Sequence, residues 1–316
     1  MSDDGMRARQ GDRKGEPILK VFVTGATGYI GSSVSAALQK RGHLVLGLAR
    51  SLESAEKLQK RGIEPYEGDL RDKDSLVAAA RKTDAMVHVA SPSDSTSAEL
   101  DNGVIDMVCS VLAGTEKPFI YTSGIWVIGE TQGADEDSPL HPIPLVKWRA
   151  VCEQRVLGAA KGDSNILACV LRPGIVYGRG GGIPASFFKS AKESGAVVFV
   201  GGGENHWPVV QVDDLADLYV RTLENKTGGT VFHGIAEEGV KVRDIALAAS
   251  DGAGIPGKIS PWPVEQARKT LGLFADALAL DQKISSVKTR RQLGWQPQAP
   301  RLVEDLRQGS YQAAGA

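Results

Sequence analysis

Three glycines spaced three residues apart are the feature of this chain most suited to chemistry. Gly25, Gly28 and Gly31 stand in the stretch VTGATGYIG, after an apolar run and where a helical pattern begins. Glycine permits a tight turn and a close backbone approach to a pyrophosphate, and the following helix N-terminus offers N–H donors. We therefore predict a dinucleotide site rather than a purely structural turn, with these residues at the cofactor: Gly25, Thr27, Gly28, Tyr29, Ile30 and Gly31.

The end of the next apolar run bears on which dinucleotide binds. This run ends at Arg50 and Ser51. An acidic residue in this place bonds the ribose hydroxyls of NAD, whereas arginine offers a two-pronged donor to the 2′-phosphate of NADP. The sequence therefore favours NADP(H) over NAD(H), with a solvated surface role for Arg50 as the alternative.

A second stretch, PLVKWRAVCEQ at 144–154, offers a lysine, an arginine, a tryptophan and a cysteine. It contains no tyrosine, serine or histidine that could pass a proton near neutral pH. Whether this absence matters depends on what the helix faces, and the surrounding elements decide that.

These stretches belong to an alternation of short apolar strands and helical patterns. Strands are predicted at 18–25, 44–50, 63–69, 85–90, 117–124 and 165–174. Helical patterns lie between the first four strands at 32–42, 54–62 and 74–83, with Gly42 as a C-terminal cap and Asp74 as an N-terminal cap. Strands that are apolar on both faces and separated by helices indicate an α/β fold, a Rossmann-type doubly wound parallel sheet.

The character of the chain changes after Gly178, where the glycine-rich stretch GRGGGIPASF begins. We predict a nucleotide-binding Rossmann domain at 17–178, completed by 228–236. A smaller substrate-binding lobe is predicted from 179–227 and 237–316. Residues 1–16 are polar and charged, which predicts a disordered leader rather than a signal peptide.

The composition argues against several classes of function. A formal net charge of −1 leaves no basic footprint for nucleic acid or acidic lipid, and no apolar run approaches the roughly 20 residues that span a bilayer. Cys109, Cys152 and Cys169 are scattered and do not have metal-ligand spacing. We expect a cytoplasmic protein without a metal site that acts on a small molecule and binds neither nucleic acid nor membrane.

Seven stretches taken together resemble one family. They are, in chain order, VTGATGYIG, EGDL (67–70), VHVASP (87–92), FIYTSG (119–124), LRPGIVYG (171–178), VVQVDDLADLYV (209–220) and RRQLGWQP (290–297). From residue 18 to about residue 308, the chain resembles the extended short-chain dehydrogenase/reductases, the NAD-dependent epimerase/dehydratase group. Members of that group often form dimers, so the resemblance also implies a homodimer.

The resemblance implies further contacts with the cofactor. Asp69 and Leu70 would flank the adenine, and Ala90 and Ser91 would pass beside the ribose and phosphates. Thr122 would end the strand beneath the nicotinamide. A backbone run would follow the nicotinamide amide, formed by Pro173, Gly174, Ile175 and Val176.

The family's chemistry uses a serine or threonine, a tyrosine, and a lysine four residues after the tyrosine. Matching FIYTSGIWVIG to the family's strand places Gly124 where the hydroxyl residue stands. Matching Glu153 to the acidic residue later in the helix places Leu145 at the tyrosine and Arg149 at the lysine. Because arginine does not deprotonate in proteins, Arg149 could keep a positive charge near the nicotinamide ribose but could not transfer a proton. The departure resembles atypical subgroups that keep the glycine loop and lack the tyrosine.

Other side chains could supply the proton, judged by their place in the family pattern. The candidate catalytic residues are Tyr177, His206 and Lys147. Tyr177 could instead be a packed aromatic, His206 a loop histidine bonded to backbone, and Lys147 a solvated residue. Residues expected to line the substrate pocket are Gly124, Trp126, Leu145, Tyr177 and His206.

Three functions fit these features. The favoured one is an NADP-dependent oxidoreductase that acts on a small carbonyl, imine or activated alkene without the Ser–Tyr–Lys triad. The intact glycine loop favours it, as it also favours a sensor, the missing triad counts against it, and a full-length second lobe favours a real substrate over a sensor. The alternatives are a non-redox isomerase, dehydratase or cyclase on the same fold, and a non-catalytic sensor of NADP(H).

Overall fold

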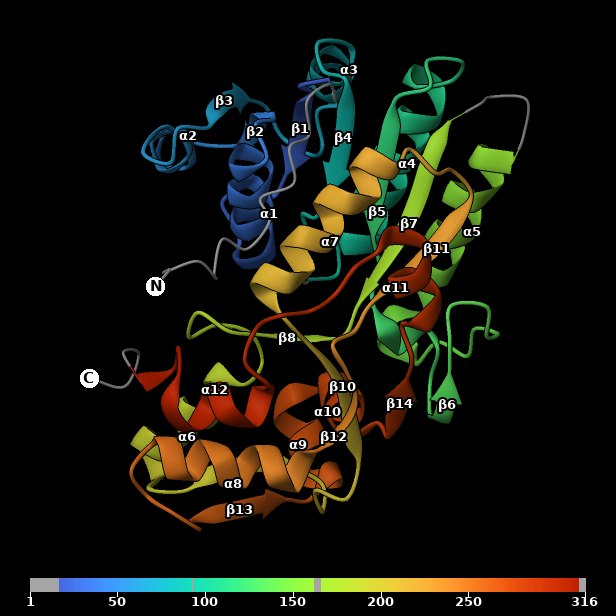
Figure 1. The fold of residues 1–316 in the computed structure, drawn as a ribbon. Coiled ribbons are helices and arrows are strands. Elements are labelled where there is room, and N and C mark those ends of the chain that lie inside the picture. Colours follow the sequence, from blue (N-terminus) through green and yellow to red (C-terminus); the bar gives the residue numbers. More distant parts are fainter. Residues whose placement is uncertain (1–16, 93, 162–165, 313–316) are drawn as a thin grey trace, which may run out of the picture.

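Seven strands form the large sheet of the structure, in the order β11-β7-β5-β4-β1-β2-β3 (Figure 1). This computed structural model describes residues 17–92, 94–161 and 166–312, so the predicted leader at 1–16 lies outside the described residues. Each neighbouring pair of these strands is parallel. The strands are β1 (Lys20–Thr24), β2 (Leu44–Ala49), β3 (Glu64–Glu67), β4 (Ala85–His88), β5 (Pro118–Thr122), β7 (Leu167–Pro173) and β11 (Thr230–Gly234).

Helices cover both faces of this sheet. Successive residues of a strand point to opposite sides, so apolar side chains on both faces must be buried against a helical layer. Val21 and Val23 of β1 are buried against one helical layer, and Phe22 between them is buried against the other. The first layer contains α1 (Tyr29–Lys40), α2 (Leu52–Gln59) and α7 (Val212–Asn225), and the second contains α3 (Lys73–Arg81), α4 (Ser97–Val111) and α5 (Lys147–Lys161). The predicted Rossmann-type doubly wound sheet is confirmed.

A smaller lobe lies beside the carboxyl ends of the strands (Figure 1). Its main sheet has the order β12-β10-β8, and two further strand pairs are β13 with β9 and β14 with β6. The remaining strands are β6 (Thr131–Ala134), β8 (Ile175–Tyr177), β9 (Val197–Val200), β10 (His206–Gln211), β12 (Glu237–Lys241), β13 (Ile259–Trp262) and β14 (Gln282–Ile284). The remaining helices are η1 (Ile125–Val127), η2 (Pro144–Val146), α6 (Ala185–Ser194), α8 (Val242–Gly252), α9 (Val264–Leu271), α10 (Phe274–Ala279), α11 (Val287–Leu293) and α12 (Leu302–Gln308).

Two predicted helix starts need correction. α1 begins at Tyr29 rather than at residue 32, so the last residues of the glycine stretch form its first turn. α3 is capped by Asp72, whose carboxylate accepts a hydrogen bond from the Ser75 backbone N–H at 3.1 Å, and Asp74 lies in the first turn. Gly42, with φ of 91°, follows the C-terminal cap of α1 in a left-handed conformation that favours glycine.

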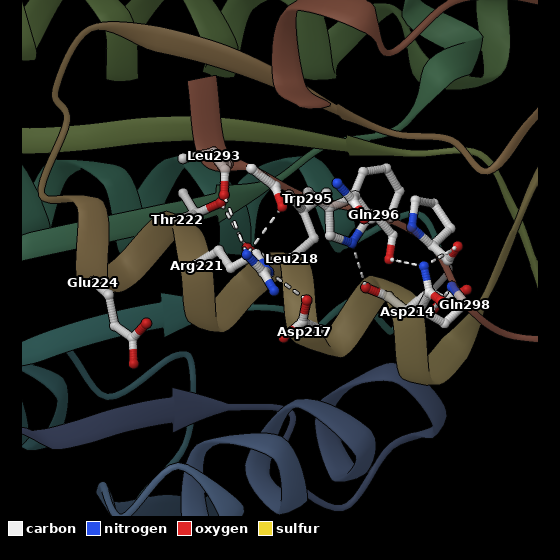
Figure 2. A network of polar contacts seen from close by, with 12 residues as sticks. Asp214, Asp217, Leu218, Arg221, Thr222, Glu224, Leu293, Trp295, Gln296 and Gln298 are labelled. Carbon is white, nitrogen blue, oxygen red and sulfur yellow. Dashed lines mark hydrogen bonds and ion pairs between the residues drawn. The ribbon is translucent and has the colours of Figure 1, made fainter. Parts of the chain in front are cut away.

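Helix α7 packs with the large sheet, although we predicted residues 179–227 in the smaller lobe. Leu218 of α7 is buried in the same cluster as Val34 of α1. Figure 2 shows the polar contacts along α7: the Asp214 carboxylate accepts from the Gln298 backbone N–H at 2.9 Å, and Trp295 Nε1 donates to the Asp214 carbonyl at 3.0 Å. The segment after α11 is therefore fastened to the large sheet through α7.

Candidate active site at the carboxyl edge of the sheet

The glycine stretch forms a tight turn between β1 and α1. Gly25 has a φ of 75°, and a Cβ there would lie 2.8 Å from the Ala90 backbone. A Cβ on Gly31 would lie 2.0 Å from the Gly25 carbonyl oxygen, so this glycine lets the helix pack closely against the turn. Gly28 is exposed, and a Cβ there would meet only the Gly25 carbonyl oxygen, at 3.3 Å. The space over Gly28 at the start of α1 is therefore left open, as a pyrophosphate cradle requires.

The Tyr29 side chain contacts the glycine-rich loop of residues 178–182. Its hydroxyl donates to the Gly178 carbonyl at 2.7 Å, and a Cβ on Gly181 would lie 2.5 Å from its ring. Burial raises the Tyr29 pKa well above its ordinary value, so the hydroxyl remains a donor. Tyr311 holds the same loop, since its hydroxyl donates to the Gly181 carbonyl at 2.6 Å. The Tyr29 contacts thereby fasten the loop to the turn between β1 and α1.

Arg149 is the central charged residue at the ends of β4 and β5. Its Nη1 donates to the Thr122 carbonyl at 2.9 Å, and its Nη2 donates to Ser91 Oγ at 3.3 Å. The guanidinium also lies 4.5 Å from the centre of the Trp148 ring. Three residues predicted at the cofactor from separate parts of the sequence, Ser91, Thr122 and Arg149, are therefore brought together.

A buried polar network lies behind the guanidinium. Tyr121 donates its hydroxyl to Asp101 Oδ2 at 2.7 Å, and Arg149 Nη1 lies 3.9 Å from the same oxygen. His88 Nε2 lies 3.3 Å from Asp101 Oδ1, and its Nδ1 lies 2.7 Å from the Thr24 hydroxyl. Burial, followed by the charge of Asp101, raises the Tyr121 pKa far above its ordinary value, so this hydroxyl stays protonated.

Sequence reasoning missed Asp101 as part of this site. One signal was present: Asp101 lies on the same face of its helix as the apolar Val104, Ile105 and Val108, which are also buried. A carboxylate on an apolar face is costly unless it is paired, so its presence there indicates a partner in the core.

The end of β5 carries the remaining groups near Arg149. The Thr122 hydroxyl and the Tyr219 hydroxyl lie 2.7 Å apart. The next residue, Ser123, is buried, and its hydroxyl has no hydrogen-bond partner among the described residues. Gly124 has extended backbone with a φ of −179°, and apart from its own and its two chain neighbours' atoms no heavy atom of the described residues lies within 4 Å of where its Cβ would be. Gly124 thus leaves room for a side chain that the backbone would accept.

Leu145 lies in η2, four residues before Arg149, and packs against an apolar cluster that includes Ile125 and Val146. Helix α5 is held in register on the sheet by a buried ion pair, in which Arg172 Nη2 lies 2.6 Å from Glu153 Oε2. Because Glu153 and Arg149 are one helical turn apart, this pair also places Arg149 along the sheet edge.

Two of the three candidate catalytic residues, Tyr177 and His206, have hydrogen-bond partners in other segments. Tyr177 is 1% exposed and donates its hydroxyl to the Pro300 carbonyl at 2.8 Å, so it is a packed aromatic. His206 lies in the smaller lobe, where its Nδ1 and its backbone N–H lie 2.9 and 2.8 Å from Asp281 Oδ1. Lys147 is exposed at the start of α5. The Tyr177 hydroxyl and the His206 ring are therefore engaged away from Arg149, whereas the role of Lys147 stays a prediction.

The other residues predicted to contact the cofactor differ in their exposure and in their hydrogen bonds. Arg50 is exposed where β2 ends, and the Ser51 hydroxyl caps α2 by accepting from the Ser54 backbone N–H at 3.2 Å. Asp69 accepts from the Arg71 backbone N–H at 2.9 Å, and Leu70 packs against the core. The run of Pro173, Gly174 and Ile175 is buried, whereas Val176 is half-buried.

Trp126 in η1 lies 5.9 Å from Phe274 of α10, measured between ring centres. An apolar contact between the two lobes therefore stands just beyond the end of β5.

Among residues 17–92, 94–161 and 166–312, no group of three or more His, Cys, Asp or Glu side chains could hold a metal ion. No helix in the same ranges is long and apolar enough to cross a membrane.

The model of the NAD-dependent epimerase/dehydratase family matches residues 21–233. The chain belongs to this family. An uncharacterized protein of Schizosaccharomyces pombe, C2A9.02, is 35% identical over 307 residues, which are 93% of this chain and 100% of the relative. The 2-alkyl-3-oxoalkanoate reductase of Stenotrophomonas maltophilia is 27% identical over 232 residues, 69% of each chain. Family membership makes the chain an enzyme of the NAD(P)-dependent oxidoreductase or epimerase kind.

Solved structures of the family share the fold at low sequence identity. UDP-glucuronic acid 4-epimerase from Bacillus cereus, in complex with UDP-glucuronic acid and NAD, has a TM-score of 0.74 at 20% identity, covering 93% of this chain and 99% of that one. The human epimerase family protein SDR39U1 with NADPH has a TM-score of 0.74 at 22% identity, covering 92% and 99%. Both likenesses extend over the smaller lobe as well as the large sheet.

Proposed function

We propose that this enzyme is an NADP(H)-dependent oxidoreductase that acts on a small carbonyl, imine or activated alkene without a tyrosine as the proton donor. The observation that carries the proposal is the pairing of Arg149, at the ends of β4 and β5, with Leu145 in the apolar cluster one turn earlier. On the proposed alignment, Arg149 stands in place of the family's lysine and Leu145 in place of its tyrosine.

The chain's own groups fit a dinucleotide at this edge. The open space over Gly28 and the N-terminus of α1 suit a pyrophosphate, and Arg149 offers a positive charge for the nicotinamide ribose. A bound nicotinamide would supply the hydride chemistry. Arg149 would orient that half of the cofactor, and Leu145 would keep water away from it. The Ser123 hydroxyl, which has no hydrogen-bond partner in the described part of the chain, could donate to the group that fills the site.

The preference for NADP(H) rests on Arg50. Its guanidinium is exposed at the end of β2, and a two-pronged donor in that place favours a 2′-phosphate. Related structures contain NAD in one case and NADPH in another, which supports a nicotinamide cofactor in general. A small-molecule substrate, a cytoplasmic location and a homodimer stay predictions.

The reductase relative supports a carbonyl substrate, since its name specifies reduction of a 3-oxo acid. The test is to incubate the enzyme and candidate carbonyl compounds with NADPH that carries deuterium in place of both C4 hydrogens, and to follow the label by mass spectrometry. Deuterium in a reduced product supports the oxidoreductase. Conversion of a substrate with all of the label still on the cofactor would instead favour an isomerase or dehydratase, and binding without any conversion would favour a sensor.

A further inference from the structure

Asp101 is a buried carboxylate whose side-chain polar contacts with the described residues lie at or just behind the candidate active site. Its side chain is 2% exposed, and the side chain of its neighbour His88 is 1% exposed. Tyr121 donates to Oδ2, His88 lies beside Oδ1, and the ion-pair partner is Arg149. A buried carboxylate persists only where hydrogen bonds and an opposite charge offset its lost hydration.

The network leaves Asp101 little freedom to turn. Tyr121 comes from β5 and His88 from β4, so both oxygens are held from the sheet while the backbone of Asp101 is held in α4. Arg149 comes from a third direction, on α5, and lies 3.9 Å from Oδ2. At this distance the two side chains form an ion pair without a hydrogen bond. The guanidinium N–H groups therefore remain free to donate to Thr122 and Ser91.

We propose that Asp101 is a positioning residue, whose negative charge holds the Arg149 guanidinium in the orientation that binds the nicotinamide half of the dinucleotide. This rests on the proposed function, because it assumes that a nicotinamide dinucleotide lies along the edge. The physical need follows from the exchange of lysine for arginine: a long, planar cation with several donors binds one ribose well only when its rotation is restricted.

The proposal predicts a loss confined to one half of the cofactor. In a doubly wound fold the adenine half lies over β2 and the nicotinamide half over β4 and β5. Asp101→Asn keeps the shape and removes the charge. We expect calorimetry to show NADP⁺ binding weakened by about tenfold, the size expected when a charged contact is lost. Adenosine 2′,5′-bisphosphate, which lacks the nicotinamide half, should bind with unchanged affinity.

A matched control exists across the same pair of helices. Asp106 of α4 forms an ion pair with Arg155 of α5 at the surface, outside the site. Asp106→Asn removes the same charge from the same helix and should leave both affinities unchanged. An equal loss for both ligands in Asp101→Asn would mean a general structural effect and would overturn the proposal.

A double-mutant cycle tests whether Asp101 acts through Arg149. In Arg149→Met the guanidinium is absent, so adding Asp101→Asn should weaken NADP⁺ no further. Two fully additive losses would overturn the proposal. If Asp101→Asn does not fold, Tyr121→Phe keeps the charge and removes one orienting hydrogen bond. Tyr121→Phe should weaken the binding of NADP⁺ by a smaller factor and leave the binding of adenosine 2′,5′-bisphosphate unchanged. If the variant binds both ligands as tightly as the unaltered protein does, the positioning role is refuted.

The two proposals fail in distinguishable ways. If the unaltered protein binds neither NADP⁺ nor NADPH, the proposed function is wrong and the positioning role falls with it. If the unaltered protein binds NADP⁺ and Asp101→Asn binds it equally well, only the positioning role is wrong.

Discussion

An added side chain should have different effects at two glycines of the same turn: it should abolish cofactor binding at Gly28 and lower the stability of the fold at Gly31. Gly28 has an extended conformation, with φ of −76° and ψ of 177°, and a Cβ there meets only one atom, at 3.3 Å. Gly28→Val should therefore fold. Its main cost is a poorer helix N-cap, about 1 kcal/mol, or a few degrees in Tm. The side chain would stand where the pyrophosphate is expected, so NADPH binding should be lost.

The smaller substitution Gly31→Ala should be the more damaging to stability. Its Cβ would lie 2.0 Å from the Gly25 carbonyl oxygen, and real Cβ atoms stay at least 3.0 Å from such an atom. The helix would have to move away from the turn by about 1 Å, and overpacking of this kind costs about 1–3 kcal/mol or more. A single methyl group at 31 should thus destabilise the protein more than an isopropyl group at 28.

The assays are thermal unfolding of each variant without cofactor and calorimetric titration with NADPH. The expected pattern is near-normal unfolding without binding for Gly28→Val, and a clearly lower Tm for Gly31→Ala. Normal NADPH affinity in a folded Gly28→Val would show that the turn is not the phosphate site. An unchanged Tm in Gly31→Ala would refute the packing argument.

Arg50→Ala should erase most of the preference for NADPH over NADH measured by calorimetry. The control Arg61→Ala, which removes an exposed arginine elsewhere, should leave the preference unchanged. Equal affinities for NADPH and NADH in the unaltered protein would refute the cofactor assignment. Combining Gly124→Ser, Leu145→Tyr and Arg149→Lys should raise carbonyl reduction by about 10²- to 10⁴-fold, the usual contribution of a general acid. No gain in a folded, cofactor-binding triple variant would show that the alignment of α5 is wrong. Burial and, to a lesser extent, the charge of Arg172 lower the pKa of His233 to about 4, against the opposing effect of Glu136. The unfolded chain therefore binds this proton first, and the free energy of unfolding should fall as pH drops from about 6.5 towards 4. In urea titrations His233→Asn should flatten this slope and the exposed His141→Asn should not; an unaltered slope in His233→Asn would contradict the assignment.

The residues that sequence reasoning misplaced share one physical cause. Tyr177 was predicted from its neighbours along the chain, but its hydroxyl is bonded to Pro300, more than a hundred residues away. His206 is likewise taken up by Asp281 of another segment. A local pattern shows which side chains could transfer a proton, yet it does not show which distant carbonyl or carboxylate will bind them.

Local patterns were sufficient where the structure itself is local. Strand alternation fixes which residues are buried on each face, and a left-handed or crowded glycine marks a turn, so the parallel sheet and the Gly25–Gly31 turn could be predicted from the sequence. The start of α1 was missed by three residues because its first turn belongs to the glycine stretch itself. The placing of α7 was wrong because the apolar face of an amphipathic helix shows that the helix packs on a core but does not specify which core.

The sequence by itself determined the fold, the glycine turn and the presence of an arginine and a leucine in the helix at 144–154. Only the tertiary structure decided that Arg149 reaches Thr122 and Ser91, and that Asp101 lies behind it. These contacts join α4, α5 and the ends of two strands, and they exist because parallel strands bring distant loops to one edge of the sheet. Spacing along the chain cannot encode such a meeting, since the partners are placed by two different helices and two different strands.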